Sequence, residues 1–151
     1  MSRIHRLSIV FSVGLSIVFS VALTAGVAGT GATEGAGLLD APTTVLDGTL
    51  SAAPGTHDAA CHLAQRPGSA GVATRSVDIA GPGKVTVELA GDSGDWDVAV
   101  FDAAGRAIAA DASPDAQEVA VGYASAAGTL RVQACRRSGD AASVPATLEH
   151  E

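Results

Sequence analysis

The sequence predicts an all-β protein: a small, jelly-roll-like antiparallel β-sandwich with one disulfide, preceded by a helical signal peptide. Three observations predict this class. Apolar residues recur at every second position in several short runs, as in strands that have one buried and one solvated face. Glycine and proline separate these runs about every 8 to 12 residues, which is typical of sandwiches and barrels. The chain also holds two cysteines behind a start typical of exported proteins.

Residues 1–32 are predicted to form a secretory signal peptide. A basic start is followed by an uncharged apolar run, 7–23, and then by small residues as far as Ala32. The apolar run contains a duplication, because the stretch LSIVFSV at 7–13 recurs at 15–21. Two copies approach the roughly 20 residues that span a bilayer, so an uncleaved N-terminal anchor is the alternative. In either case the chain after Ala32 is expected outside the cytoplasm, and cleavage would make it a secreted protein.

Residues 33–43 are expected to be a flexible leader, and residues 44–151 to form one domain. All sixteen acidic residues lie after Ala32, against seven basic ones, so this part of the chain has a net charge of −9. Such a surface disfavours phosphate backbones and anionic lipids. We therefore expect no nucleic-acid partner, no membrane contact unless the N-terminal segment is retained, and a monomer.

Within the domain, period-two alternation predicts a series of strands around an apolar core. Trp96 is expected to be the largest core residue. The segment 102–105 (DAAG) has the composition of a tight turn, because an aspartate opens it and a glycine closes it. Ile108 would then lie on the return strand. The alternating runs are at 76–79, 84–89, 95–100, 119–121 and 129–134.

Cys61 and Cys135 are predicted to form a disulfide, since an exported chain with an even number of cysteines generally pairs them. Closing a loop of this length stabilises a fold by about 4 kcal/mol in the chain-entropy model. A metal site built on two cysteines would need further ligands. His62 is adjacent to Cys61, but nothing comparable flanks Cys135.

The segment 91–95 (GDSGD) has the look of the nucleophile loop of trypsin-like serine proteases. Those enzymes need a histidine base and a buried aspartate as well as the serine. Only about thirty residues separate His62 from Ser93, too few for the aspartate-bearing barrel between them. The histidine that follows, His150, is next to the last residue. The sequence therefore predicts no catalytic residue, and Ser93 is interpreted as the tip of an exposed turn.

Several aspartates gather near this turn, and oxygen-rich loops of this kind can bind calcium. The spacing does not fit an EF-hand loop, because the required glycine and glutamate are missing. A solvated turn and a polar strand face are the simpler interpretation. No other cofactor is predicted.

The run 94–105 (GDWDVAVFDAAG) resembles a motif of the bacterial pre-peptidase C-terminal domain family, which joins Gly-Asp-x-Asp to an alternating strand and a glycine-ended turn. The segments 83–89 and 128–134 are similar to further strands of that family, and the resemblance covers about 69–148. It implies a β-sandwich accessory module of secreted proteins, most often peptidases. Only Asp95 and Asp97 match the family's acidic positions, as calcium candidates. The chain departs from the family at Val98 and Ala99, where members often carry aromatic residues.

The expected function is that of a secreted, non-catalytic accessory or binding module. The resemblance implies a secreted peptidase or an extracellular polymer as its partner, and a role in secretion or substrate attachment. One alternative is a membrane-tethered surface protein of the same fold. Another is a small secreted hydrolase or inhibitor.

Overall fold

The computed structural model describes residues 41–151. The predicted signal peptide, 1–32, and most of the predicted leader lie outside the described residues. The first strand begins at Thr43, the last position of that leader. The described residues form strands and turns only, so none of them belongs to a helix that could cross a membrane.

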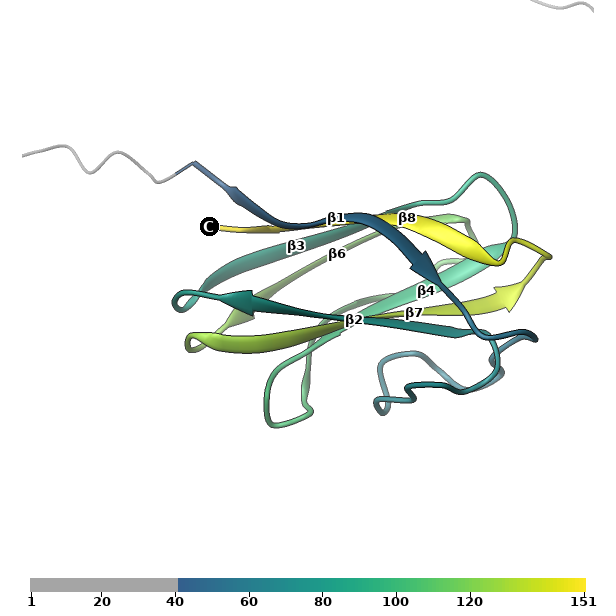
Figure 1. Ribbon diagram of the computed structural model, residues 1–151, viewed down its shortest axis with the longest axis horizontal. Coiled ribbons are helices and arrows are strands. Elements are labelled where there is room, and N and C mark those ends of the chain that lie inside the picture. The colour runs from purple at the N-terminus through teal and green to yellow at the C-terminus, as the bar shows by residue number, and fades with distance from the viewer. Residues whose placement is uncertain (1–40) are drawn as a thin grey trace, which may run out of the picture. The chain divides into compact units, whose positions relative to one another are not determined.

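Eight strands form two antiparallel sheets of four, which confirms the all-β class (Figure 1). Sheet one has the strand order β1-β8-β3-β6, and sheet two has the order β2-β7-β4-β5. The strands are β1 (Thr43–Ser51), β2 (Val72–Ile79), β3 (Gly83–Ala90), β4 (Asp95–Phe101), β5 (Ala107–Asp111), β6 (Gln117–Ala124), β7 (Gly128–Ser138) and β8 (Ser143–His150).

The pairing follows a simple rule: β1 pairs with β8, β2 with β7, β3 with β6 and β4 with β5. A long hairpin with β4 and β5 at its tip, folded over on itself, produces this pattern. It is the connectivity of an eight-stranded jelly roll. The strands predicted from alternation lie within β2, β3, β4, β6 and β7, and Ile108 lies on β5 as expected. Strands β1 and β8 were not predicted.

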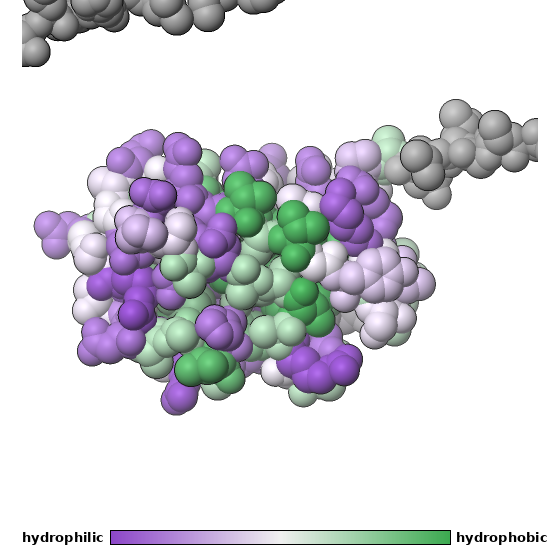
Figure 2. Space-filling model, turned by 180° about the vertical axis from the view of Figure 1, so that it is seen from behind, coloured by the Kyte–Doolittle hydropathy of each residue, from purple (hydrophilic) through white to green (hydrophobic). Residues whose placement is uncertain are grey.

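The outward faces of the two sheets differ. In sheet one, β3 alternates as predicted and β8 alternates as well, with polar or small side chains outward on both strands. Its edge strand β6 instead turns apolar side chains outward, and Figure 2 shows apolar side chains gathered on the side of the molecule where the β5 and β6 edges lie. Sheet two has no solvated face along β4, because all its residues from Trp96 to Phe101 are buried.

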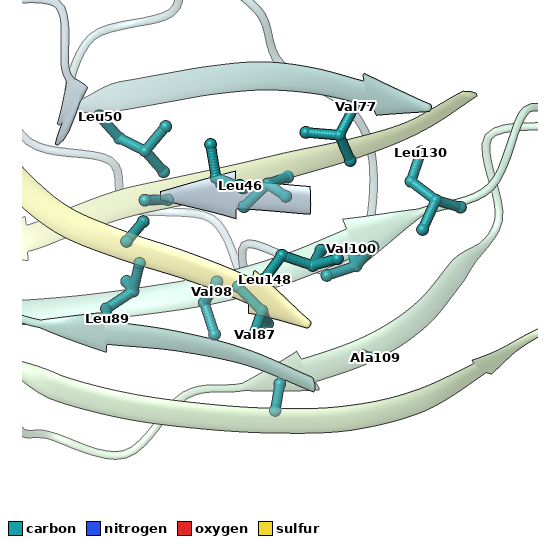
Figure 3. Close-up of a cluster of buried hydrophobic side chains, with 14 of the residues drawn as sticks. Leu46, Leu50, Val77, Val87, Leu89, Val98, Val100, Ala109, Leu130 and Leu148 are labelled. Atoms are coloured by element: carbon teal, nitrogen blue, oxygen red, sulfur yellow. The ribbon is translucent and has the colours of Figure 1, made fainter. Parts of the chain in front are cut away.

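The core between the sheets is built from valine, leucine and alanine (Figure 3). Val87 and Leu89 of β3 and Leu148 of β8 face Val98 and Val100 of β4, and each of the five is fully buried. Trp96 is also fully buried and is the largest such side chain, as predicted.

The predicted turn at 102–105 is confirmed. The N–H of Gly105 donates to the carbonyl oxygen of Asp102 at 2.9 Å, and the N–H of Arg106 donates to Oδ1 of Asp102 at 2.9 Å. Gly105 has a φ of +80°, which glycine adopts without strain. Asp102 also forms a salt bridge with Arg106 at 2.6 Å.

Candidate functional site

The outer face of sheet two is covered by the segment between β1 and β2, residues 52–71, which we call the cover loop. A second buried cluster lies beneath it, separate from the main core: Cys61, Val72, Ala99, Phe101 and Cys135. The alternation rule predicts that one face of every strand meets water. That expectation is wrong for β4 and for the middle of β7, because the cover loop excludes water from both.

The disulfide predicted between Cys61 and Cys135 is present and joins the cover loop to β7. The two Cα atoms lie 5.8 Å apart, well within the usual range for a disulfide. Cys61 is 1 % exposed and Cys135 is fully buried. The bond therefore fixes the centre of the cover loop to the sheet beneath it.

Gln133 on β7 provides a second attachment for the cover loop. Its Nε2 donates to the carbonyl oxygens of Cys61, at 2.8 Å, and Ala64, at 3.1 Å. Its Oε1 accepts from the N–H of Arg66 at 2.7 Å. The side chain is fully buried, and these three bonds satisfy backbone groups of a loop that has no strand partner of its own there. Alternation with Val132 and Ala134 alone predicts a solvated position for Gln133. The signal for its burial is its place two residues before Cys135, which puts both side chains on the same face of β7.

Two arginines hold the beginning of the cover loop. Arg136 donates through Nε to the carbonyl oxygen of Gly55 at 3.0 Å. Arg137 donates through one nitrogen to the carbonyl oxygens of His57, at 2.6 Å, and Ala59, at 2.7 Å. Each guanidinium thus supplies donors to carbonyl groups of a segment that belongs to no strand, since buried or half-buried carbonyl groups need a donor.

The calcium candidates Asp95 and Asp97 lie beside this attachment, on β4. Asp97 is 5 % exposed, and its Oδ2 lies 3.6 Å from Nε of Arg137. Burial raises the pKa of the Asp97 carboxyl, Arg137 opposes that rise, and the negative charge of Asp95 adds to it. Oδ1 of Asp95 is buried and has no hydrogen-bond partner within the part of the chain that the structure describes. The site therefore combines two carboxylates with one guanidinium, and within residues 41–151 no cluster of three or more His, Cys, Asp or Glu is placed to hold a metal ion.

The residues that gave the protease-like appearance do not share this environment. Ser93 is exposed in the turn between β3 and β4, as predicted. The adjacent Gly94 has a φ of +86° and packs against the carbonyl oxygen of Ser138. His62 is exposed on the cover loop, and His150 lies on β8, in the other sheet.

A second buried carboxyl group, not singled out by the sequence, lies where β5 turns into β6. Glu118 is fully buried, and its Oε1 accepts from the hydroxyl of Ser113 at 2.6 Å. Asp111 is close by and binds the N–H of Val119. Burial raises the pKa of Glu118 to about 7, the Ser113 bonds oppose the rise, and Asp111 adds to it.

Neither a scan against models of known protein families nor a search of the curated proteins found a match for this chain.

Proposed function

We propose that this protein is an exported, non-catalytic binding module, of the accessory kind implied by its resemblance to the pre-peptidase C-terminal domains. The observation that carries the proposal is the construction of the cover loop. A disulfide, one buried glutamine and two arginines fix a segment without regular structure onto a sheet. The buried disulfide is consistent with an oxidising, extracytoplasmic location.

The cover loop also displays an apolar side chain to solvent. Leu63 is 71 % exposed, only two residues from the buried Cys61, and His62 beside it is exposed as well. A rigid loop that presents an apolar contact loses little entropy on binding, which is how preorganised surfaces gain affinity. We assign the partner-binding surface to Leu63 and its exposed neighbours, and the partner to an extracellular protein polymer or a secreted peptidase.

Co-sedimentation tests this assignment. The secreted chain is incubated with insoluble collagen, elastin and casein, and bound protein is measured in the pellet. We expect binding to at least one of them, with an affinity at least tenfold weaker for Leu63→Asp. Thr49→Asp, an exposed position on β1 in the other sheet, is the matched control and should bind normally. Failure to bind any of these polymers or a secreted peptidase would contradict the assignment. Equal binding by Leu63→Asp and Thr49→Asp would contradict it as well.

Two outcomes would favour the alternative functions. Hydrolysis of an ester or peptide panel that is lost in Ser93→Ala would indicate an enzyme. Retention of the chain with membranes, together with an intact N-terminus by sequencing, would indicate a tethered surface protein.

We also propose calcium as a ligand of Asp95 and Asp97, supported by the unpartnered buried oxygen of Asp95. Arg137 competes with this binding, because its positive charge lies against Asp97. Calcium should therefore raise the melting temperature slightly in the natural chain and more in Arg137→Gln, and not in Asp95→Ala. An equal effect of calcium on all three proteins would argue against the site.

A further inference from the structure

Strand β6 forms one edge of sheet one, and the backbone groups of this strand alternate in direction. The N–H of Gly91 donates to the carbonyl oxygen of Ala116 at 3.1 Å, one step beyond the Ala90–Gln117 pair. Even-numbered residues of β6 therefore bond to β3, and odd-numbered ones point their N–H and C=O away from it. The N–H of Val119 does so, because it donates to Oδ2 of Asp111 at 3.3 Å.

The side chains of the same odd-numbered residues are apolar and exposed. Val119 is 53 % exposed, Val121 58 % and Tyr123 62 %. Only one other large apolar side chain of residues 41–151, Leu63, is comparably exposed. Figure 2, which faces this side of the molecule, shows the apolar surface spreading over it.

The other three sheet edges carry features that discourage strand addition. The edge strand β1 exposes threonines and Asp47. The edge strand β2 exposes Arg75, Ser76 and Asp78. The edge strand β5 has only five residues and ends in Asp111. Strand β6 exposes no lysine, no arginine and no proline, and no strand within residues 41–151 pairs with its free edge.

We propose that β6 pairs with β6 of a second copy of this chain, antiparallel and about a two-fold axis at Gly122. The register follows from the backbone. Asp111 already occupies the N–H of Val119, so Val121 and Tyr123 are the next outward-pointing residues along the strand. An axis at Gly122 places Val121 opposite Tyr123 of the second copy, twice, and forms four N–H···O=C bonds. This arrangement is isologous, as closed dimers require.

The same axis brings further apolar surface together. Val121 of each copy would lie beside Tyr123 of the other, a favourable cross-strand combination. Strand β5 lies directly beneath Gly122, because a Cβ built there would be 2.0 Å from the carbonyl oxygen of Ile108. The β5 edges of the two copies would therefore also approach each other at Ile108, which is half-buried.

Charge opposes the association and predicts its salt dependence. Each mature copy has a net charge of −9 after Ala32. Lys84 lies beside Tyr123 in the β3–β6 pairing, and its positive charge offsets the net negative charge only locally. The dimer should therefore strengthen at higher ionic strength, where repulsion between the copies is screened.

Sedimentation velocity of the secreted chain tests the dimer, over about 1 to 500 µM because a small interface is expected to be weak. Val121→Pro removes an N–H that points away from β3, so the β3–β6 ladder remains complete. We expect the natural chain to dimerise and Val121→Pro to bind itself at least tenfold more weakly. Leu63→Lys, the control for an exposed apolar residue elsewhere, should dimerise like the natural chain.

Two further measurements test the dimer without relying on Val121→Pro. Tyr123→Lys changes only an exposed side chain, and should weaken the dimer even if Val121→Pro fails to fold. Amide exchange at Val121 and Tyr123 should slow as protein concentration rises, whereas that at the Asp111-bonded Val119 should change little. A monomer throughout the concentration range, or a dimer unaffected by Tyr123→Lys, would overturn the proposal.

Discussion

At the scale of single residues, the surroundings of the buried polar side chains determine how each should respond to substitution and to pH. Gln133, Asp97 and Glu118 are each no more than 5 % exposed, yet they lie in different surroundings. Gln133 is surrounded by backbone partners, Asp97 lies against a guanidinium, and Glu118 has a hydroxyl and a second carboxylate for neighbours. Burial penalises an ion more than an amide, so these residues should respond differently to substitution and to pH.

Gln133→Ala should destabilise the fold by roughly 3 kcal/mol, because it leaves three backbone groups of the cover loop without partners in a buried site. Urea unfolding measures the change. Gln117→Ala, at an exposed position on β6, is the control and should change stability by less than about 0.5 kcal/mol. Equal effects of the two substitutions would show that the Gln133 bonds contribute nothing to stability.

Glu118 should make stability depend on pH. The folded pKa is about 7 and the ordinary value is 4.5, so the folded state binds more protons between these values. Its contribution is therefore fully present below pH 4.5 and is lost as the pH rises through 7. The loss is at most about 3 kcal/mol. Urea midpoints measured from pH 4 to 8 should fall in the natural chain and fall less in Glu118→Gln; parallel curves would refute the assignment.

At the scale of elements, the cover loop is the part least like the rest of the fold. Within the loop, Ala53 and Ala70 form one isolated bridge. The loop is otherwise attached mainly through β7, by side chains of that strand and by the N–H of His57, which donates to the carbonyl oxygen of Arg136 at 2.8 Å. Its attachment turns the outer face of sheet two into a second, smaller core. Among residues 41–151, no comparable segment covers the outward face of sheet one.

Replacing both cysteines by alanine should lower the free energy of unfolding by about 4 kcal/mol, because the unfolded chain regains the entropy of a loop that spans a sequence separation of 74 residues. Denaturant unfolding gives the magnitude. Amide exchange gives the location: the Ala99 and Phe101 region should lose protection before the β3–β8 region does. Uniform loss of protection would mean that the cover loop does not open separately.

Gly122→Ala tests the close crossing of β5 beneath β6. The new methyl group would overlap the carbonyl oxygen of Ile108, so we expect a loss of roughly 2 kcal/mol. Gly81→Ala is the matched control, since nothing lies within 4 Å of a Cβ there. Thermal unfolding of the two variants should differ clearly; a Gly122→Ala protein as stable as the control would place β5 farther from β6.

The elements also differ in how well the sequence predicts them. Strands with uninterrupted alternation, such as β3 and β4, were predicted nearly to their ends. Strand β8 alternates too, but Pro145 within it lowers its strand propensity. In β1 the two buried leucines, Leu46 and Leu50, lie on one face, but the residue between them on that face is Gly48, so the apolar alternation is interrupted. The disulfide was predictable from cysteine count, whereas the burial of Gln133 and Asp97 depends on a loop whose path no local pattern specifies.

At the scale of the whole molecule, the disulfide joins the cover loop to sheet two inside the fold. Both cysteines are at most 1 % exposed, so a reductant cannot reach them in the folded state. Reduction by dithiothreitol should therefore be limited by opening of the protein, and its rate should rise steeply with urea. A reduction rate that increases in proportion to reductant and is insensitive to urea would reveal a local route to the disulfide.

The pairing of β1 with β8 has a mechanical consequence. Thr43 lies opposite His150, so the polypeptide enters and leaves the sandwich at the same point, as Figure 1 shows. A force that pulls these two points apart would load the β1–β8 hydrogen bonds one after another, as a zipper opens, rather than all together. The sandwich would then yield at low tension when held by its ends, whereas a pull applied between the middle of β7 and the cover loop would be borne by the covalent Cys61–Cys135 bond.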